Sequence, residues 1–170
     1  MIGRYLILAS AFLFCSAATE EPPLIGPAQV ANGSTLRFGE LLVPLIGIDA
    51  PSSPQHCVSG SGEFYNCGRT SAEALNALVA GRVVECHHAG GGRSSARCTV
   101  AGLDLAEAML RAGQAVIVEG GDMPSYAAAE TEARENGRGI WAGQFVYPAK
   151  WRVLFRYSSP IAAVPARTSE

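Results

Sequence analysis

Residues 28–51 read AQVANGSTLRFGELLVPLIGIDAP and contain three strand signals in a row. The Asn32-Gly33 pair between the first two signals is the strongest short indication of a β-hairpin. Gly39-Glu40 supplies a second turn signal. We therefore expect an N-terminal meander of three antiparallel strands, at residues 28–31, 35–38 and 41–48.

Three helices are predicted after this meander. Thr70 and Glu73 form a capping box at the start of the first helix, and the spacing of Leu103, Ala106 and Leu110 predicts the second. The third begins around Asp122 and Pro124. Glycines suit the exits of all three helices, and they stand at Gly81, Gly113 and Gly137.

Further strands are expected between these helices. Residues 83–88 and 96–100 flank a glycine-rich loop at Gly90-Gly91-Gly92, and residues 115–118 form a shorter strand signal. Three hairpin-connected strands, a helix, two strands and then helices is the element order of an α+β domain.

The first eighteen residues are expected to be a secretory signal peptide. Residues 1–4 carry a positive charge, residues 5–14 are apolar, and residues 16–18 are small, as signal peptidase requires. An apolar run of about ten residues is too short to span a bilayer. We therefore divide the chain into signal peptide 1–18, linker 19–27, domain 28–152 and a partly disordered tail 153–170, with no transmembrane segment after cleavage.

The charge balance argues against a protein specialised in gripping nucleic acid. The chain has 13 Lys and Arg against 15 Asp and Glu, a formal net charge of −2, and Lys150 is its single lysine. Proteins that bind polyphosphate usually present a basic face. Nucleic acid is therefore a less favoured partner than a polysaccharide or a periplasmic protein.

Four cysteines remain once Cys15 leaves with the signal peptide. An even count in a small exported domain favours disulfides, which also fits a secreted or periplasmic location. Pairing of strands 83–88 and 96–100 would bring two of the cysteines together, and the other two bracket a loop rich in serine and glycine. Of the three possible pairings we favour Cys57–Cys67 with Cys86–Cys98. Zinc is the alternative, because His56, His87 and His88 adjoin two of these cysteines, although the closely spaced pairs of zinc sites are missing.

Ordered blocks of residues over about 28–152 resemble the staphylococcal nuclease-like (thermonuclease) family. The blocks are Gly47-Ile48-Asp49-Ala50-Pro51, Cys67-Gly68, Gly92-Arg93, Asp104-Leu105, Arg111-Ala112-Gly113, Gly139-Ile140-Trp141 and Trp151-Arg152. The resemblance implies an OB-fold, a five-stranded barrel with three helices, which binds oligonucleotides or oligosaccharides along one face.

The resemblance also implies a calcium-dependent phosphodiesterase site, and this chain departs from it. Two family carboxylates hold the calcium ion; the first falls on Ser34 and only the second is kept, as Asp49. Asp49 also suits a structural role, capping backbone amides of its own turn.

The residues that the family uses on the phosphate and the water are depleted as well. The first of two arginines that brace the phosphate falls on Pro44, and the second is kept as Arg93. The glutamate that activates water falls on Ser52, whose hydroxyl is no base near neutral pH. The aromatic residues Trp141, Phe145 and Trp151 are expected to pack between helix and barrel.

We therefore expect an exported nuclease-like domain that has lost its hydrolytic chemistry, binds no cofactor and acts as a binding or accessory protein. Its layout is similar to a degenerate exported branch of the family associated with exopolysaccharide (succinoglycan) biosynthesis. Two alternatives stay open: a calcium-dependent secreted nuclease with a rebuilt site, and a structural partner of a periplasmic complex that uses the C-terminal tail.

Overall fold

The meander predicted from residues 28–51 is present. A computed structural model of the protein describes residues 22–88, 95–118 and 123–158. In it β2 (Gln29–Asn32), β3 (Thr35–Phe38) and β4 (Leu41–Pro44) pair antiparallel in this order. The third strand is shorter than predicted, because Gly47, with φ +75°, separates β4 from β5 (Ile48–Asp49). The signal peptide at 1–18, the glycines at 90–92, Arg93 and Asp122 lie outside the described residues.

The turn between β2 and β3 needs its glycine for space. The Asn32 side-chain oxygen accepts a hydrogen bond from the backbone N–H of Ser34 at 2.9 Å, as in an Asx turn. A Cβ atom on Gly33 would lie 1.9 Å from the Ser71 hydroxyl oxygen of the first helix. Any other residue at position 33 would therefore push the turn away from this helix.

The segment expected to be an entry linker contributes a strand, which corrects that expectation. β1 (Leu24–Pro27) pairs antiparallel with β8 (Val83–His88), and β8 pairs with β9 (Ala96–Val100). A parallel bridge between Leu45 and Ala96 then leads back to the chain after β4. Strands β1 and β2 follow each other directly, so we count them as one segment. Together with β3, β4, β8 and β9 they make five strand segments around the core, the number expected for an OB barrel.

The core fills the space inside these strands and under the helices. Its fully buried side chains come from the meander, the first two helices and the β8–β9 hairpin, and they include Leu36, Val43, Leu75, Val84, Met109 and Leu110. Burying one such aliphatic side chain contributes about 1.5–3 kcal/mol.

Helix α1 (Cys67–Val79) begins one turn earlier than the Thr70 capping box predicted. Its N-cap is Asn66, whose side chain accepts from the backbone N–H of Arg69 at 2.8 Å. Thr70 instead donates its hydroxyl to the Asn66 carbonyl. A better N-cap four residues upstream decides the start, whereas the exit at Gly81, with φ +70°, is as predicted.

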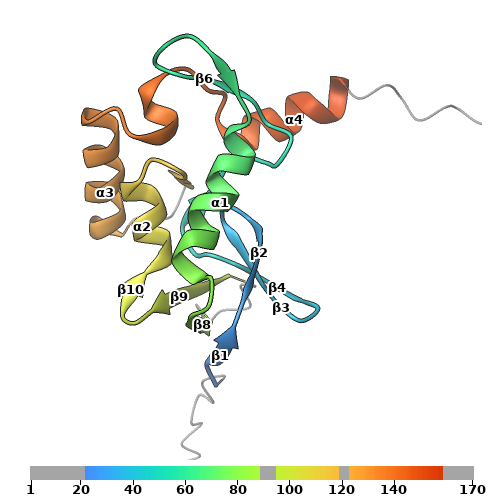
Figure 1. Cartoon of the computed structure of the whole chain (residues 1–170), viewed down its shortest axis with the longest axis vertical. Coiled ribbons are helices and arrows are strands. Elements are labelled where there is room, and N and C mark those ends of the chain that lie inside the picture. Colours follow the sequence, from blue (N-terminus) through green and yellow to red (C-terminus); the bar gives the residue numbers. More distant parts are fainter. Residues whose placement is uncertain (1–21, 89–94, 119–122, 159–170) are drawn as a thin grey trace, which may run out of the picture.

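Helices α2 (Leu105–Arg111) and α3 (Pro124–Glu135) pack side by side on one flank, with α1 between them and the meander (Figure 1). Leu103, expected on the second helix, lies on β10 (Leu103–Asp104), because the Asp104 side chain caps α2 at the backbone N–H groups of residues 106 and 107. The third helix begins at Pro124 as expected. A short strand, β11 (Val116–Ile117), pairs with β5.

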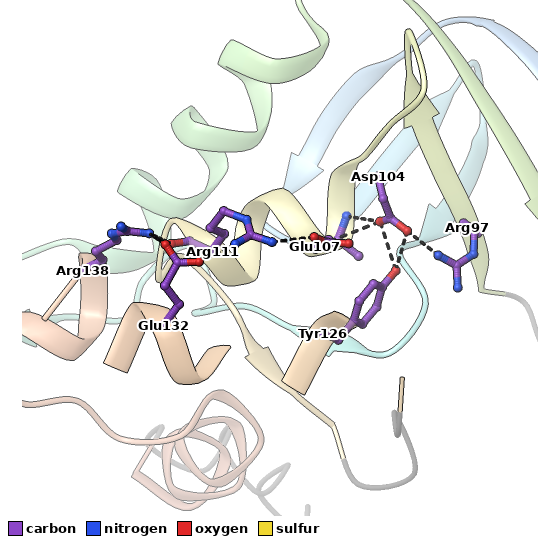
Figure 2. A network of polar contacts seen from close by, with 8 residues as sticks. Arg97, Asp104, Glu107, Arg111, Tyr126, Glu132 and Arg138 are labelled. Carbon is purple, nitrogen blue, oxygen red and sulfur yellow. Dashed lines mark hydrogen bonds and ion pairs between the residues drawn. The ribbon is translucent and has the colours of Figure 1, made fainter. Parts of the chain in front are cut away.

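A polar network joins α2 and α3 to the barrel (Figure 2). The hydroxyl of the buried Tyr126 donates to both carboxylate oxygens of Asp104 at 3.0 Å, and Arg97 of β9 contacts the same carboxylate. Farther along, Arg111 pairs with Glu107 and with Glu132. Each charge in this network faces an opposite charge, so we assign it a structural role.

The C-terminal segment differs most from expectation. A 3₁₀ turn, η1 (Gly139–Ala142), is followed by α4 (Pro148–Ser158), so residues 153–158 of the predicted tail belong to a helix, and residues 159–170 lie outside the described residues. Figure 1 places α4 at the end of the molecule opposite β1. The described residues thus form one α-helix more than the three predicted. None of the described helices combines the length and apolar character needed to cross a membrane.

Both predicted cysteine pairs are at disulfide distance. Cys86 and Cys98 face each other across β8 and β9 with Cα atoms 4.0 Å apart. Cys57 of β6 (Cys57–Val58), which pairs with β7 (Phe64–Tyr65), joins Cys67 at the start of α1 with 5.6 Å between Cα atoms. This pairing leaves none of the four thiols for the alternative zinc site.

Candidate functional site

Four of the positions that match site residues of the family lie within the described residues, and all four line one surface pocket. Ser34, Pro44, Asp49 and Ser52 all line it, and the pocket measures about 660 Å³. The walls come from the β2–β3 turn, the end of β4, β5, the loop after β5 and α4. The complete lining is Ala31, Asn32, Ser34, Thr35, Pro44, Ile48, Asp49, Ala50, Ser52, Ser53, Pro54, Val118, Ala149 and Arg152.

The central feature of the pocket is an ion pair between Asp49 and Arg152. The two terminal nitrogens of the Arg152 guanidinium donate to the two oxygens of Asp49, at 3.0 Å and 2.7 Å. Such two-point pairs are stronger and more directional than single hydrogen bonds. The hydrogen bond to Asp49, reinforced by the carboxylate charge, raises the pKa of Arg152 above its ordinary value. Arg152 therefore stays charged at every physiological pH.

The two partners belong to segments that are 103 residues apart in the chain. Asp49 lies on β5, paired with Val116 of β11, and only 15% of its side chain is exposed. Arg152 lies in the first turns of α4 with 41% of its side chain exposed. A carboxylate largely withdrawn from water requires a partner, and α4 supplies it. This pairing replaces the backbone capping that the sequence suggested for Asp49.

The residues present do not fit a calcium ion. Calcium takes six to eight oxygen ligands, several of them from carboxylates. Among the described lining residues Asp49 is the sole carboxylate, and both of its oxygens accept from Arg152. In residues 22–88, 95–118 and 123–158 no three His, Cys, Asp or Glu side chains gather in a group suited to a metal.

The position of the family glutamate is built into the wall of the pocket. The Ser52 carbonyl accepts from the Gln55 backbone N–H at 2.7 Å. A Cβ atom on Gly68 of α1 would lie 1.8 Å from this same carbonyl oxygen. The loop that carries Ser52 is thus pressed against the start of α1, next to the Cys57–Cys67 disulfide. Arg37 and Glu40, the nearest alternative charges in sequence, line a different pocket.

Aromatic side chains lie beside this region without lining the pocket. Trp141 meets Phe145 edge to face at 4.9 Å, and both pack against a small buried cluster with Ile140. This agrees with the packing role expected for them. Trp151, also expected to pack onto the barrel, stacks on Phe155 within α4 at 4.6 Å.

Sequence reasoning assigned no role to Arg152, although it belongs to one of the blocks that carry the family resemblance. A usable signal was present. Loss of the first family carboxylate, at Ser34, leaves Asp49 as a lone acidic group in a site built to hold charge, and such a group needs a cation. The candidates in the chain were its arginines, and only the placement of α4 selects one.

Comparison with known proteins identifies the family of the chain. The family described as "Staphylococcal nuclease homologue" matches residues 42–143. A relative, the "Succinoglycan biosynthesis protein ExoI" of Rhizobium meliloti (strain 1021), is 36% identical over 143 residues, which cover 81% of this chain and 74% of the relative. The matched family region contains β5, the Ser52 loop and α1 to α3, and it ends before α4. The chain is therefore a member of the staphylococcal nuclease family.

Proposed function

We propose that this protein is an exported, non-hydrolytic member of its family that acts as a binding or accessory protein in exopolysaccharide biosynthesis. The observation that carries the proposal is the Asp49–Arg152 pair, which fills with a guanidinium the place where the family resemblance implies a metal ion. Support for the biosynthetic role comes from the similarity to a succinoglycan biosynthesis protein. Two disulfide pairs favour the oxidising environment of the periplasm or the medium.

Loss of hydrolysis follows from what the pocket lacks. Phosphodiester cleavage of this kind needs a metal, a base for the water and cations on the phosphate. Ser34, Pro44 and Ser52 supply none of these, and Asp49 is engaged by Arg152. Loss of one transition-state charge partner costs about 10²–10³ in rate, so the combined losses should leave no measurable nuclease.

A nuclease assay tests the first part of the proposal. Purified protein is incubated with single-stranded DNA and with RNA, first with calcium and then with EDTA, and the products are resolved on a gel. We expect intact substrate in both conditions. Digestion that requires calcium and disappears in the Asp49→Ala and Arg93→Ala variants would support the rival function, a secreted calcium-dependent nuclease.

A complementation experiment tests the biosynthetic role. The gene is expressed in Rhizobium meliloti that lacks the succinoglycan relative, and secreted polysaccharide is measured against the strain that carries the relative itself. We expect both the wild-type protein and its Lys150→Ala control variant to restore polysaccharide production. Export of the protein without any restoration would argue against a shared role.

A further inference from the structure

We propose that the Asp49–Arg152 pocket binds an uncharged, hydroxyl-rich ligand, a neutral saccharide unit, rather than a phosphodiester. This inference rests on the proposed function and specifies the class of ligand for the same pocket.

The first step is the charge of the pocket. Asp49 and Arg152 are the only ionisable residues among its described lining, and they neutralise each other through two hydrogen bonds. Binding of a polyphosphate draws its affinity from cations that are free to replace the counterions of the phosphate. In this pocket the charge of Arg152, the one cation among the described lining residues, is already neutralised by Asp49. A phosphate that approached Arg152 would also approach the Asp49 carboxylate and be repelled by it. The pocket therefore disfavours a polyanion.

The second step is the hydrogen-bonding capacity of the walls. Hydroxyl groups donate and accept, and the lining residues Thr35, Ser52 and Ser53 each carry one. A guanidinium has five N–H groups in a fixed plane, and the pair with Asp49 uses only two of them. Carboxylate oxygens can each accept more than one hydrogen bond. The pair thus presents adjacent donors and acceptors, an arrangement that matches neighbouring hydroxyls of a sugar ring.

The third step is size and shape. The pocket of about 660 Å³ falls within the range of about 300–1,000 Å³ that is usual for small-molecule sites. Several walls consist of small side chains, such as Ala31, Ala50 and Ala149. Small walls leave room for a ring that meets both the ion pair and the hydroxyls. An apolar ligand would instead leave the remaining N–H groups of Arg152 and the hydroxyls without hydrogen-bond partners in a dry contact, which is costly.

The test uses purified protein and two kinds of probe of similar length. The neutral probes are the tetrasaccharides cellotetraose and laminaritetraose, and the anionic probe is a thymidine tetranucleotide. Binding is followed by two-dimensional NMR of backbone amides. We expect at least one tetrasaccharide to bind with a dissociation constant of about 1 mM or tighter, to shift amides at Ser34, Ser52 and Ser53, and to be insensitive to salt. We expect no shifts with the tetranucleotide.

Two variants, each of which removes one charge of the pair, should change the binding of the two kinds of probe in opposite directions. Asp49→Asn keeps the shape of the side chain but leaves Arg152 uncompensated, so the tetranucleotide should gain affinity at least about tenfold, and salt should reverse the gain. Arg152→Gln should weaken tetrasaccharide binding at least about tenfold, because a hydrogen bond from a charged donor is lost. Lys150→Gln, on the same helix but outside the pocket lining, should change neither, and circular dichroism checks that every variant is folded.

The outcomes separate this inference from the proposed function. Salt-dependent binding of the tetranucleotide by the wild type, or binding of neither tetrasaccharide, overturns the neutral-saccharide assignment even when no nuclease activity is found. An unchanged affinity for the tetranucleotide in a folded Asp49→Asn variant overturns the charge compensation on which the assignment rests. Calcium-dependent cleavage of DNA instead overturns the proposed function itself.

Discussion

The side chain of Asp49 is 15% exposed, and among the described residues Arg152 is the one that balances its charge. Exposed ion pairs contribute about 0–1 kcal/mol, and removing one partner of a fully buried pair costs about 3–5 kcal/mol. This pair lies between the two cases. We expect Arg152→Ala to lower the free energy of unfolding by about 1–2 kcal/mol, measured by urea denaturation.

The control for this substitution is Lys150→Ala on the same helix. Lys150 is exposed and does not line the pocket, so its replacement should change stability by less than about 0.5 kcal/mol. Equal losses in the two variants would mean that α4 matters for its packing and not for the ion pair.

A second residue-scale prediction concerns Tyr126, whose side chain is fully buried. Burial, aided by the neighbouring Asp104 charge, raises the pKa of Tyr126 far above its ordinary value. The phenol therefore stays a hydrogen-bond donor to Asp104 at all moderate pH values. Tyr126→Phe leaves this half-buried carboxylate with fewer partners and should cost about 1–3 kcal/mol.

Tyr147→Phe is the matched control for Tyr126→Phe. The Tyr147 hydroxyl accepts from Arg134 at 3.3 Å, but its side chain is exposed, and water can replace the lost contact. Urea midpoints of the two variants should differ clearly. A loss at Tyr147 as large as that at Tyr126 would show that burial is not what makes the Asp104 contact valuable.

At the scale of single residues, sequence reasoning could identify the positions of the site but not its chemistry. Ser34, Pro44, Asp49 and Ser52 were grouped through a family pattern, and the structure does bring them to one pocket. Arg152 was not grouped with them, because it stands 103 residues after Asp49. Local sequence patterns carry no information on which distant cation reaches a given carboxylate.

At the scale of elements, the Cys57–Cys67 disulfide ties the β6–β7 hairpin to the start of α1. It closes a loop of eleven residues that has few apolar anchors, and in the chain-entropy description such a closure contributes about 2–3 kcal/mol. The double variant Cys57→Ala/Cys67→Ala should lose about this amount in urea denaturation.

Peptide mapping without reductant should recover Cys57 linked to Cys67 and Cys86 linked to Cys98, and crossed links would contradict the register of β8 and β9.

Elements with strong local signals were predicted well, and elements stabilised by distant contacts were not. The Asn32-Gly33 hairpin and the glycine exits of the helices are local features, and they are present. Strand β1 was taken for a linker because residues 22–27 are rich in Pro and Gly, and its strand geometry depends on pairing with β8. The second half of helix α4 was assigned to the tail, because the contact that fixes the helix on the barrel is an ion pair with the distant Asp49.

At the scale of the whole molecule, calcium should not stabilise the protein. A ligand that binds only the folded state contributes RT ln(1 + [L]/Kd). With one carboxylate, already engaged by Arg152, we expect a Kd no tighter than about 1 mM, so 1 mM calcium (about the extracellular range) adds at most about 0.4 kcal/mol. Thermal unfolding with 1 mM calcium should therefore match unfolding with EDTA within about 3 °C, and a larger rise would reveal a metal site.

The position of Arg152 on α4 has a consequence for how members of this family can be recombined. The family match ends at residue 143, whereas the cation that neutralises Asp49 is encoded after it. A chimera that joins this barrel to a C-terminal extension without an arginine at this position would inherit a bare carboxylate, although every other described lining residue except Ala149 stayed the same. Swapping the extension alone thus becomes a way to retune ligand preference, and a cloning boundary drawn at the end of the conventional domain would change the molecule it was meant to isolate.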